Sequence, residues 1–246
     1  MLDLRLAGLQ PGVVTLVAGR PGMGKSALAR RITDANSEAG IGVHVFSLED
    51  TRAAYMDRVI GEHASIAADR LRSGQITRRD EMRSVRDAAG RLVKRTHWHV
   101  DDRSGIGARE IVRSVRRARR ENDTQVVVVD YIQLLTKRPG MKTHEAIGEN
   151  MNLLADAAKQ DGMAYVVVSQ LNRECEKRDK KQPRLSDLKE CGTLEERSKA
   201  VVAVYRPWAY DETQDRDLMQ LIVLKNTNGG TGYCDVRWDG PLTRIW

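Results

Sequence analysis

The chain has 246 residues, 41% of them hydrophobic and 4% aromatic, and its formal net charge is +7. This length allows one large α/β domain or two small ones, and the charge favours a polyanionic partner such as nucleic acid, although a basic solvated surface gives the same balance. Three cysteines without C-x-x-C spacing indicate neither a disulfide framework nor a zinc site. Without a signal peptide or an apolar run of ~20 residues, we expect a cytoplasmic protein that does not enter membranes.

The first predicted element is a short buried strand at residues 13–19, "VVTLVAG", which ends in glycine. A glycine-rich loop follows, and a helix is predicted from Lys25 to about Ser37. The next predicted strand is "VHVFS" at 43–47, and residues 51–95 are predicted to form charged helices. We expect three glycines to separate these helices: Gly61, Gly74 and Gly90.

The alternation of strands and helices continues through the middle of the chain. A strand is predicted at 97–100, a basic helix at 108–122, a fully apolar strand "QVVVVD" at 125–130, a helix near 144–160 and the strand "AYVVVS" at 164–169. A polar stretch follows, and the apolar runs "AVVAVY", "QLIVLK" and "YCDVRW" then predict C-terminal strands. This order predicts a mostly parallel sheet with a strand-rich C-terminal edge, in one domain over residues 1–246.

The segment "GRPGMGKSAL" at 19–28 fits the phosphate-binding pattern G-x-x-x-x-G-K-[ST] between a strand and a helix. Such a loop points backbone N–H groups at phosphate, Lys25 would reach the β- and γ-phosphates, and the Ser26 hydroxyl would bind Mg²⁺. The sequence therefore predicts nucleoside-triphosphate binding. The expected nucleotide contacts are Gly19, Pro21, Gly22, Met23, Gly24, Lys25, Ser26 and Ala27.

Polar residues follow three of the predicted strands. Asp130 comes directly after four valines and is the expected partner of Ser26 at the metal, although an aspartate can also simply cap a strand end. Glu49 follows "VHVFSL", where a carboxylate could orient or deprotonate water. Gln170 follows "AYVVVS" and could report γ-phosphate occupancy to the next loop.

That loop, "LNRECEKRDKKQPRLSDLKECG" at 171–192, carries more basic than acidic residues. Long polar loops in compact domains are usually functional or disordered. A basic loop beside a nucleotide site suits a nucleic-acid motor, whereas a solvated surface loop is the simpler alternative.

These motifs make the chain resemble the C-terminal motor domain of DnaB-type replicative helicases, within the RecA-like P-loop ATPases. The segments "GRPGMGKSALA", "FSLE", "VVVVDYIQLL", "SQLNRECEKR" and "PRLSDLKECGTLEE" occur in the family's order nearly end to end. The resemblance implies a RecA-like α/β fold, ATP and Mg²⁺ as ligands, and a motor domain without the family's N-terminal collar domain.

The resemblance also implies roles for individual residues. Lys25 and Ser26 would bind phosphate and Mg²⁺, Glu49 would be the catalytic base, Asp130 the Mg²⁺-linked acid and Gln170 the γ-phosphate sensor. The family's single-stranded DNA contacts map onto "SDLKECG". The expected DNA-binding residues are Lys189, Glu190 and Gly192, with Arg184 in the same loop.

One departure concerns the family's K-x-R-N-G segment, which reaches the neighbouring subunit's nucleotide. Lys225 is present in "LKNTNGG", but Thr227 stands where the arginine finger belongs. Such a finger is worth ~10³–10⁵ in rate. Lys225 alone could act, Arg206 could substitute, or the protein could be a slow ATPase.

The sequence therefore predicts an ATP-driven DNA helicase motor that forms a ring, expected to be hexameric, around single-stranded DNA, with a primase or a helicase loader as a further partner. Two alternatives stay open. One is a RecA- or RadA-like recombination ATPase, and the other is a weakly hydrolysing, nucleotide-gated DNA-binding module.

Overall fold

A nine-stranded sheet runs through the molecule in the order β3-β2-β4-β5-β1-β6-β7-β8-β9. The computed structural model describes residues 2–95, 97–188 and 192–246. The strands are β1 (Val14–Gly19), β2 (Gly42–Ser47), β3 (Trp98–Asp101), β4 (Thr124–Asp130), β5 (Ala164–Gln170), β6 (Ser198–Tyr205), β7 (Leu218–Asn226), β8 (Gly232–Asp239) and β9 (Arg244–Ile245).

Strands β3, β2, β4, β5, β1 and β6 pair in parallel, whereas β7, β8 and β9 extend the sheet with antiparallel pairing. Antiparallel strands need only short connections, and the last three strands follow one another closely in the chain. The predicted fold class, a mostly parallel sheet with a strand-rich C-terminal edge, is confirmed.

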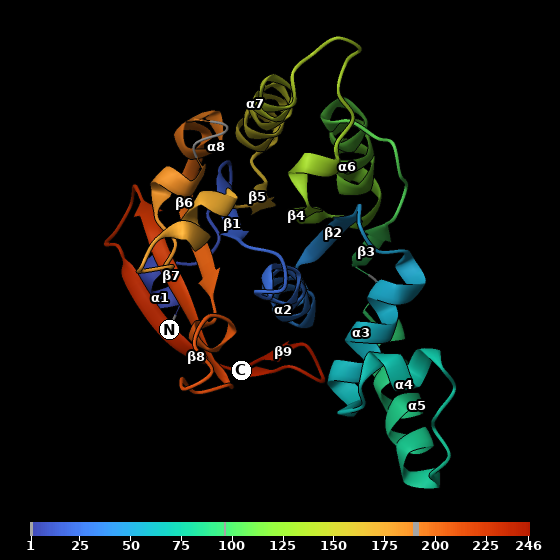
Figure 1. Cartoon of the computed structure of the whole chain (residues 1–246). Helices are drawn as coiled ribbons and strands as arrows, with labels where there is room; N and C mark the ends of the chain where they lie inside the picture. The colour runs from blue at the N-terminus through green and yellow to red at the C-terminus, as the bar shows by residue number, and fades with distance from the viewer. Residues whose placement is uncertain (1, 96, 189–191) are drawn as a thin grey trace.

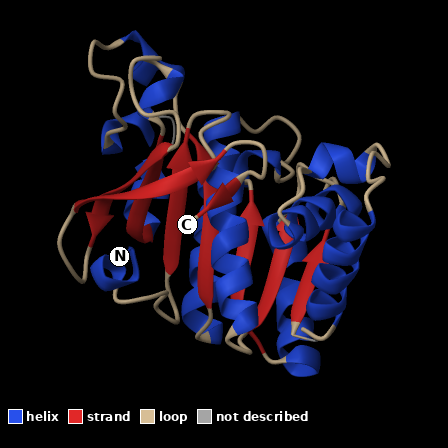
Figure 2. Cartoon of the chain, turned by 90° about the horizontal axis from the view of Figure 1, so that it is seen from below, coloured by secondary structure: helices blue, strands red, loops and turns tan. Residues whose placement is uncertain are grey.

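Helices cover both faces of the sheet, with α2 on one face and α6 and α7 on the other (Figures 1 and 2). The α-helices are α1 (Leu2–Leu6), α2 (Lys25–Glu38), α3 (Arg52–Ala64), α4 (Ala68–Arg72), α5 (Arg79–Val93), α6 (Ala108–Asn122), α7 (Thr143–Asp161) and α8 (Gly192–Arg197). Short 3-10 helices are η1 (Ile132–Leu134), η2 (Arg173–Lys177), η3 (Leu185–Leu188) and η4 (Pro207–Ala209). None of the helices in the described ranges is long and apolar enough to cross a membrane.

The two faces of the sheet build two separate hydrophobic cores. In β4, Val126 and Val128 pack into the core beneath α2, whereas Val127 and Val129 pack into the core beneath α6 and α7. Successive side chains of a strand point to opposite faces, so a strand covered on both sides must be apolar at every position. This is why "QVVVVD" shows no alternation.

The predicted separation of the charged helices at 51–95 is wrong at two of its three glycines. Gly74 lies in a turn after α4, but Gly61 lies inside α3 and Gly90 lies inside α5. A β-carbon at Gly61 would stand 2.5 Å from the carbonyl oxygen of Ile66, so this glycine permits close packing of the chain that leaves the helix.

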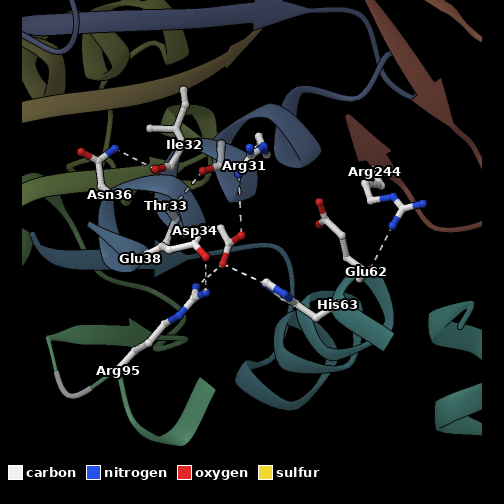
Figure 3. A network of polar contacts seen from close by, with 11 residues as sticks. Arg31, Ile32, Thr33, Asp34, Asn36, Glu38, Glu62, His63, Arg95 and Arg244 are labelled. Atoms are coloured by element: carbon white, nitrogen blue, oxygen red, sulfur yellow. Dashed lines mark hydrogen bonds and ion pairs between the residues drawn. The ribbon is translucent and has the colours of Figure 1, made fainter. Parts of the chain in front are cut away.

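A polar network around Asp34 ties α2 to the helices that project from the sheet (Figure 3). The Asp34 carboxylate accepts a hydrogen bond from His63 Nε2 of α3 at 2.9 Å and pairs with Arg95, which follows α5. Burial by itself would raise the pKa of Asp34, but the hydrogen bonds from His63 and Arg95 outweigh it and the pKa is lowered. The carboxylate therefore stabilises the fold when it is charged.

We expect Asp34→Asn to lower the free energy of unfolding by about 2–4 kcal/mol at pH 7, because it leaves the part-buried guanidinium of Arg95 without its counterion. Since the folded pKa of Asp34 is lowered, its contribution is complete above about pH 4 and is lost as the pH falls through the folded value. Urea unfolding at pH 7 and pH 3 measures both effects. The exposed Asp179→Asn is the control, and equal urea midpoints for the two variants at pH 7 would contradict the prediction.

Candidate functional site

The glycine-rich loop joins β1 to α2 with a backbone that only glycine adopts easily. Gly22 and Gly24 have φ values of 74° and 99°, in the left-handed region. A β-carbon at Gly24 would also stand 2.6 Å from Met219 Cε. Gly24 is the N-cap of α2 and has no side chain to accept the helix's first N–H groups, so these groups and the positive end of the helix dipole are available to an anion.

A cavity of about 280 Å³ lies in front of this loop, where the carboxyl ends of β2, β4 and β5 meet the start of α2. Parallel strands end at the same edge of a sheet, which brings together residues far apart in the chain. The sequence-predicted residues that line the cavity are Pro21, Gly22, Gly24, Lys25, Ser26, Ala27, Glu49, Asp130 and Gln170. Gly19 lies behind Lys25 at the end of β1, and the Met23 side chain is buried in the core.

Lys25 supplies a largely buried positive charge, with 8% of its surface exposed. Its Nζ donates a hydrogen bond to the backbone oxygen of Arg20 at 3.0 Å. Burial lowers the pKa of Lys25, and the nearby Asp130 and Glu49 carboxylates oppose this shift. The ammonium has two further N–H donors with which it can bind phosphate oxygens.

Asp130 ends β4 and carries a carboxylate oxygen, Oδ1, that is buried without a hydrogen-bond partner. Burial raises the pKa of Asp130, and a hydrogen bond with Ser26 opposes the rise. An unpartnered buried carboxylate oxygen beside a hydroxyl group is a donor set of the kind that Mg²⁺ prefers. The residues present therefore fit the metal that the loop motif implies.

Gln170 ends β5, and its backbone is held by Gln133, which lies in η1 directly after Asp130 and Tyr131. Gln133 Oε1 accepts a hydrogen bond from the Gln170 N–H at 3.3 Å, and Gln133 Nε2 donates to Ser169 Oγ at 2.9 Å. The ends of β4 and β5 are thus joined by one side-chain amide. Gln133 lies in the segment "VVVVDYIQLL", but its role was not predicted, because the contact joins the ends of two strands that are far apart in the chain.

Six further residues that line the cavity were not predicted from the sequence: Arg30, Asp50, Arg58, Tyr131, Trp238 and Thr243. Arg30 could have been found, because it lies four residues after Ser26 on the same face of α2. Arg58 of α3 pairs with Asp50. Trp238 and Thr243 come from the C-terminal strands, and no local pattern connects them with residues at 19–28.

The residues expected to act across a subunit boundary lie apart from the cavity or at its rim. Lys225 of β7 does not line it, and its Nζ donates to the backbone oxygen of Glu195 at 2.6 Å. Thr227 donates its backbone N–H to the oxygen of Lys199 at 2.9 Å. Arg206 stacks over Trp238 at 5.0 Å and donates to the Gly22 oxygen at 3.5 Å, so it lies beside the loop of its own chain.

Two of the four expected DNA-binding residues can be placed. Arg184 is exposed, and its backbone N–H donates to Asp187 Oδ2 at 2.8 Å. Gly192 is exposed at the start of α8. Lys189 and Glu190 lie outside the described residues.

We expect Asp130→Asn to raise the thermal midpoint of the protein without nucleotide by about 2–4 °C at pH 7, because it removes a buried charge worth ~1 kcal/mol of destabilisation. The raised pKa means that this cost, and hence the gain, shrinks as the pH falls from 7 towards 4. The same variant should lose the extra thermal shift that Mg²⁺ adds to ATP.

Thermal unfolding with ATP, with and without Mg²⁺, checks both parts of the Asp130 prediction, and Asp179→Asn again serves as the control. If the thermal midpoint of Asp130→Asn with ATP still rises normally on addition of Mg²⁺, Asp130 does not bind the metal.

The chain is similar to bacterial helicases over almost all of its length. It is 32% identical to the replicative DNA helicase DnaB of Haemophilus influenzae, covering 99% of this chain and 53% of that protein. It is 31% identical to the replicative DNA helicase DnaC of Bacillus subtilis, covering 94% of this chain and 51% of that protein. The chain thus spans about half the length of the curated relatives it matches.

Two solved structures have the same fold. The structure described as "ATPase Domain of G40P" superposes with a TM-score of 0.94 at 26% identity, covering 99% of this chain and 87% of the other. A DnaB-like replicative helicase, described with its interactions with primase, also gives 0.94, at 25% identity and 59% coverage of that chain. Residues 1–246 match the family described as DnaB-like helicase C terminal domain. The resemblance seen in the motifs is confirmed, and the chain belongs to the DnaB-like helicase C-terminal domain family.

Proposed function

We propose that this chain is an ATP-hydrolysing motor domain that moves along single-stranded DNA and unwinds duplex DNA in the bacterial or phage replication machinery of the cytoplasm. The observation that carries the proposal is the convergence of Lys25, Ser26, Glu49, Asp130 and Gln170 on one cavity at the carboxyl edge of the sheet. Relatives over the whole chain are replicative DNA helicases, which supports DNA unwinding as the use of that cavity.

The cavity offers a group for each requirement of phosphoryl transfer to water. The loop N–H groups and Lys25 bind the phosphates, and Ser26 and Asp130 hold Mg²⁺. When bound, Mg²⁺ supplies positive charge that neutralises the phosphate oxygens. Glu49 orients the attacking water and takes its proton, and Gln170 contacts the γ-phosphate at the end of β5.

Lys225 supports a site shared between subunits. It belongs to the strand-rich C-terminal edge, and it does not line the cavity of its own chain. A ring of identical chains, which we propose to be a hexamer, would bring this edge to a neighbour's nucleotide. Single-stranded DNA would pass through the ring and contact Arg184, Lys189, Glu190 and Gly192. A primase is the proposed further partner, since a solved relative is described with one.

Thr227 favours one second candidate, a nucleotide-gated DNA-binding module that hydrolyses ATP slowly. Its side-chain hydroxyl reaches the Lys199 oxygen at 3.3 Å and carries no charge that could stabilise a neighbour's γ-phosphate. Stimulation of ATP hydrolysis by saturating single-stranded DNA distinguishes the motor from this module, which would show none.

We expect Lys25→Ala to lower the ATP hydrolysis rate by ~10²–10³-fold, because the phosphates lose their only side-chain cation in the loop's fixed pattern. Circular dichroism should show an unchanged fold. The exposed Lys159→Ala on α7 is the matched control. A Lys25→Ala protein that hydrolyses ATP at the normal rate would refute the ATPase assignment.

We expect Lys189→Ala to weaken single-stranded DNA binding and to reduce the slope of log K against log[salt] by about 0.7, the value for one lost phosphate contact. Fluorescence anisotropy of a labelled oligothymidylate over a salt series measures this slope. Lys159→Ala should keep the original slope, and an unaltered slope in Lys189→Ala would exclude that residue from the DNA interface.

A further inference from the structure

The phosphate-binding loop is joined to the basic loop at 171–192 by one arginine that no motif role accounts for. The guanidinium of Arg20 makes two hydrogen bonds to the Glu176 carboxylate, from Nε to Oε1 at 2.9 Å and from Nη2 to Oε2 at 3.3 Å. Its third nitrogen, Nη1, donates to the backbone oxygen of Leu171 at 2.8 Å. All three nitrogens of the side chain are thus engaged by the segment that follows Gln170.

The Arg20–Glu176 pair is partly shielded from water. The side chains are 11% and 38% exposed, and the Tyr210 hydroxyl donates to Glu176 Oε1 at 3.4 Å. Each partner favours the charged form of the other. The hydrogen bond to Glu176 raises the pKa of Arg20, and the hydrogen bond from Arg20 lowers the pKa of Glu176. A planar two-point contact fixes orientation as well as distance, which a lysine could not do.

On the nucleotide side, Arg20 belongs to the loop that cradles phosphate. Its backbone oxygen accepts the hydrogen bond from Lys25 Nζ at 3.0 Å, and the preceding Gly19 oxygen accepts one from the Leu171 N–H at 3.2 Å. The residue next to Leu171 is Gln170, which lines the cavity. A change in the loop backbone on phosphate binding therefore acts directly on the position of the Arg20 side chain.

On the DNA side, a second arginine–carboxylate pair continues the connection. Arg178, directly after η2, makes two hydrogen bonds to Asp187 of η3, from Nη1 to Oδ1 at 2.9 Å and from Nη2 to Oδ2 at 2.8 Å. The Asp187 backbone oxygen also accepts from the Asn172 N–H at 3.0 Å. Asp187 lies two residues before Lys189. Glu176 lies in η2 and Arg178 follows two residues later, directly after η2, so the two pairs are connected in series through this short segment.

We propose that Arg20 is a positioning residue that couples nucleotide binding to single-stranded DNA binding through Glu176. Arg20 holds the Glu176 carboxylate and thereby η2, and Arg178, directly after η2, holds Asp187, which precedes Lys189 by two residues in the chain. The proposal rests on the proposed function, since it needs both ligands. It assigns the coupling to this ion pair rather than to Gln170 alone.

The coupling is measured as a ratio of affinities. Fluorescence anisotropy gives the affinity for labelled oligothymidylate with and without saturating Mg²⁺ and the non-hydrolysable analogue AMP-PNP, at one protein concentration and one salt concentration. We expect the ratio in the unaltered protein to lie between about 5 and 150, the usual range for coupled sites. AMP-PNP affinity with and without DNA must give the same ratio.

Glu176→Gln is the principal variant, because it lies outside the phosphate-binding loop and keeps the size of the side chain. Glu174→Gln, two residues away in the same 3-10 helix and paired at 2.6 Å with Lys177 on the surface, is the matched control. Arg20→Met and the double variant complete a double-mutant cycle. A residue with a merely structural role would change stability or both separate affinities and would leave the ratio alone.

We expect the ratio to fall to within about twofold of 1 in Glu176→Gln, in Arg20→Met and in the double variant, while Glu174→Gln keeps the original ratio. An unchanged ratio in both single variants overturns the proposal. So does a ratio of 1 in the unaltered protein that binds both ligands, although the proposed binding functions then stand. An unaltered protein that binds neither ligand refutes the proposed function itself.

Discussion

The structure depends on one constraint: six parallel strands are covered by helices, so that most of their buried positions are apolar and the charged side chains of the cavity lie where the strands end. Asp130 and Gln170 end such strands, and Glu49 lies two residues after the end of β2. Since the strands run in the same direction, these ends share one edge with the start of α2. The candidate chemistry is therefore placed by the same burial rule that builds the two cores.

That edge concentrates charge at a cost to stability. Lys25 is buried and its pKa is lowered, and the part-buried Asp130, with its buried Oδ1, has a raised pKa, so burial works against the charged form of each. The Asp130 Oδ1 atom, which is buried without a hydrogen-bond partner, also lowers stability. A fold selected for stability alone would give this oxygen a donor. The network around Asp34 shows the opposite arrangement, in which hydrogen bonds outweigh burial and the carboxylate stabilises the connection between α2 and α3.

The sheet and most of the cavity could be predicted from sequence because their signals are local. Runs such as "VVVVD" indicate a strand that is buried on both faces. The glycine-rich loop is recognised because its glycines, Lys25 and Ser26 follow at fixed spacing between a strand and a helix. Gly61 and Gly90 were wrongly predicted as breaks, because a glycine can also lie inside a helix. Gly61 permits close packing there, whereas a β-carbon at Gly90 would meet nothing within 4 Å. Thr243 was beyond prediction: its place beside the loop depends on the antiparallel turn back of β8 and β9, and it is held there by hydrogen bonds from Arg30. Contacts between segments this far apart have no periodicity to reveal them.

Trp238 places a fluorescent side chain in the wall of the cavity. Its indole ring lines the cavity, with the Arg206 guanidinium over its face at 5.0 Å. The other tryptophans, Trp98, Trp208 and Trp246, do not line it. Indole emission responds to nearby charge, and a triphosphate brings several negative charges to the loop that Arg206 also contacts. The chain therefore carries its own spectroscopic reporter of occupancy, at the wall formed by its C-terminal strands, and needs no attached dye to follow a ligand entering or leaving.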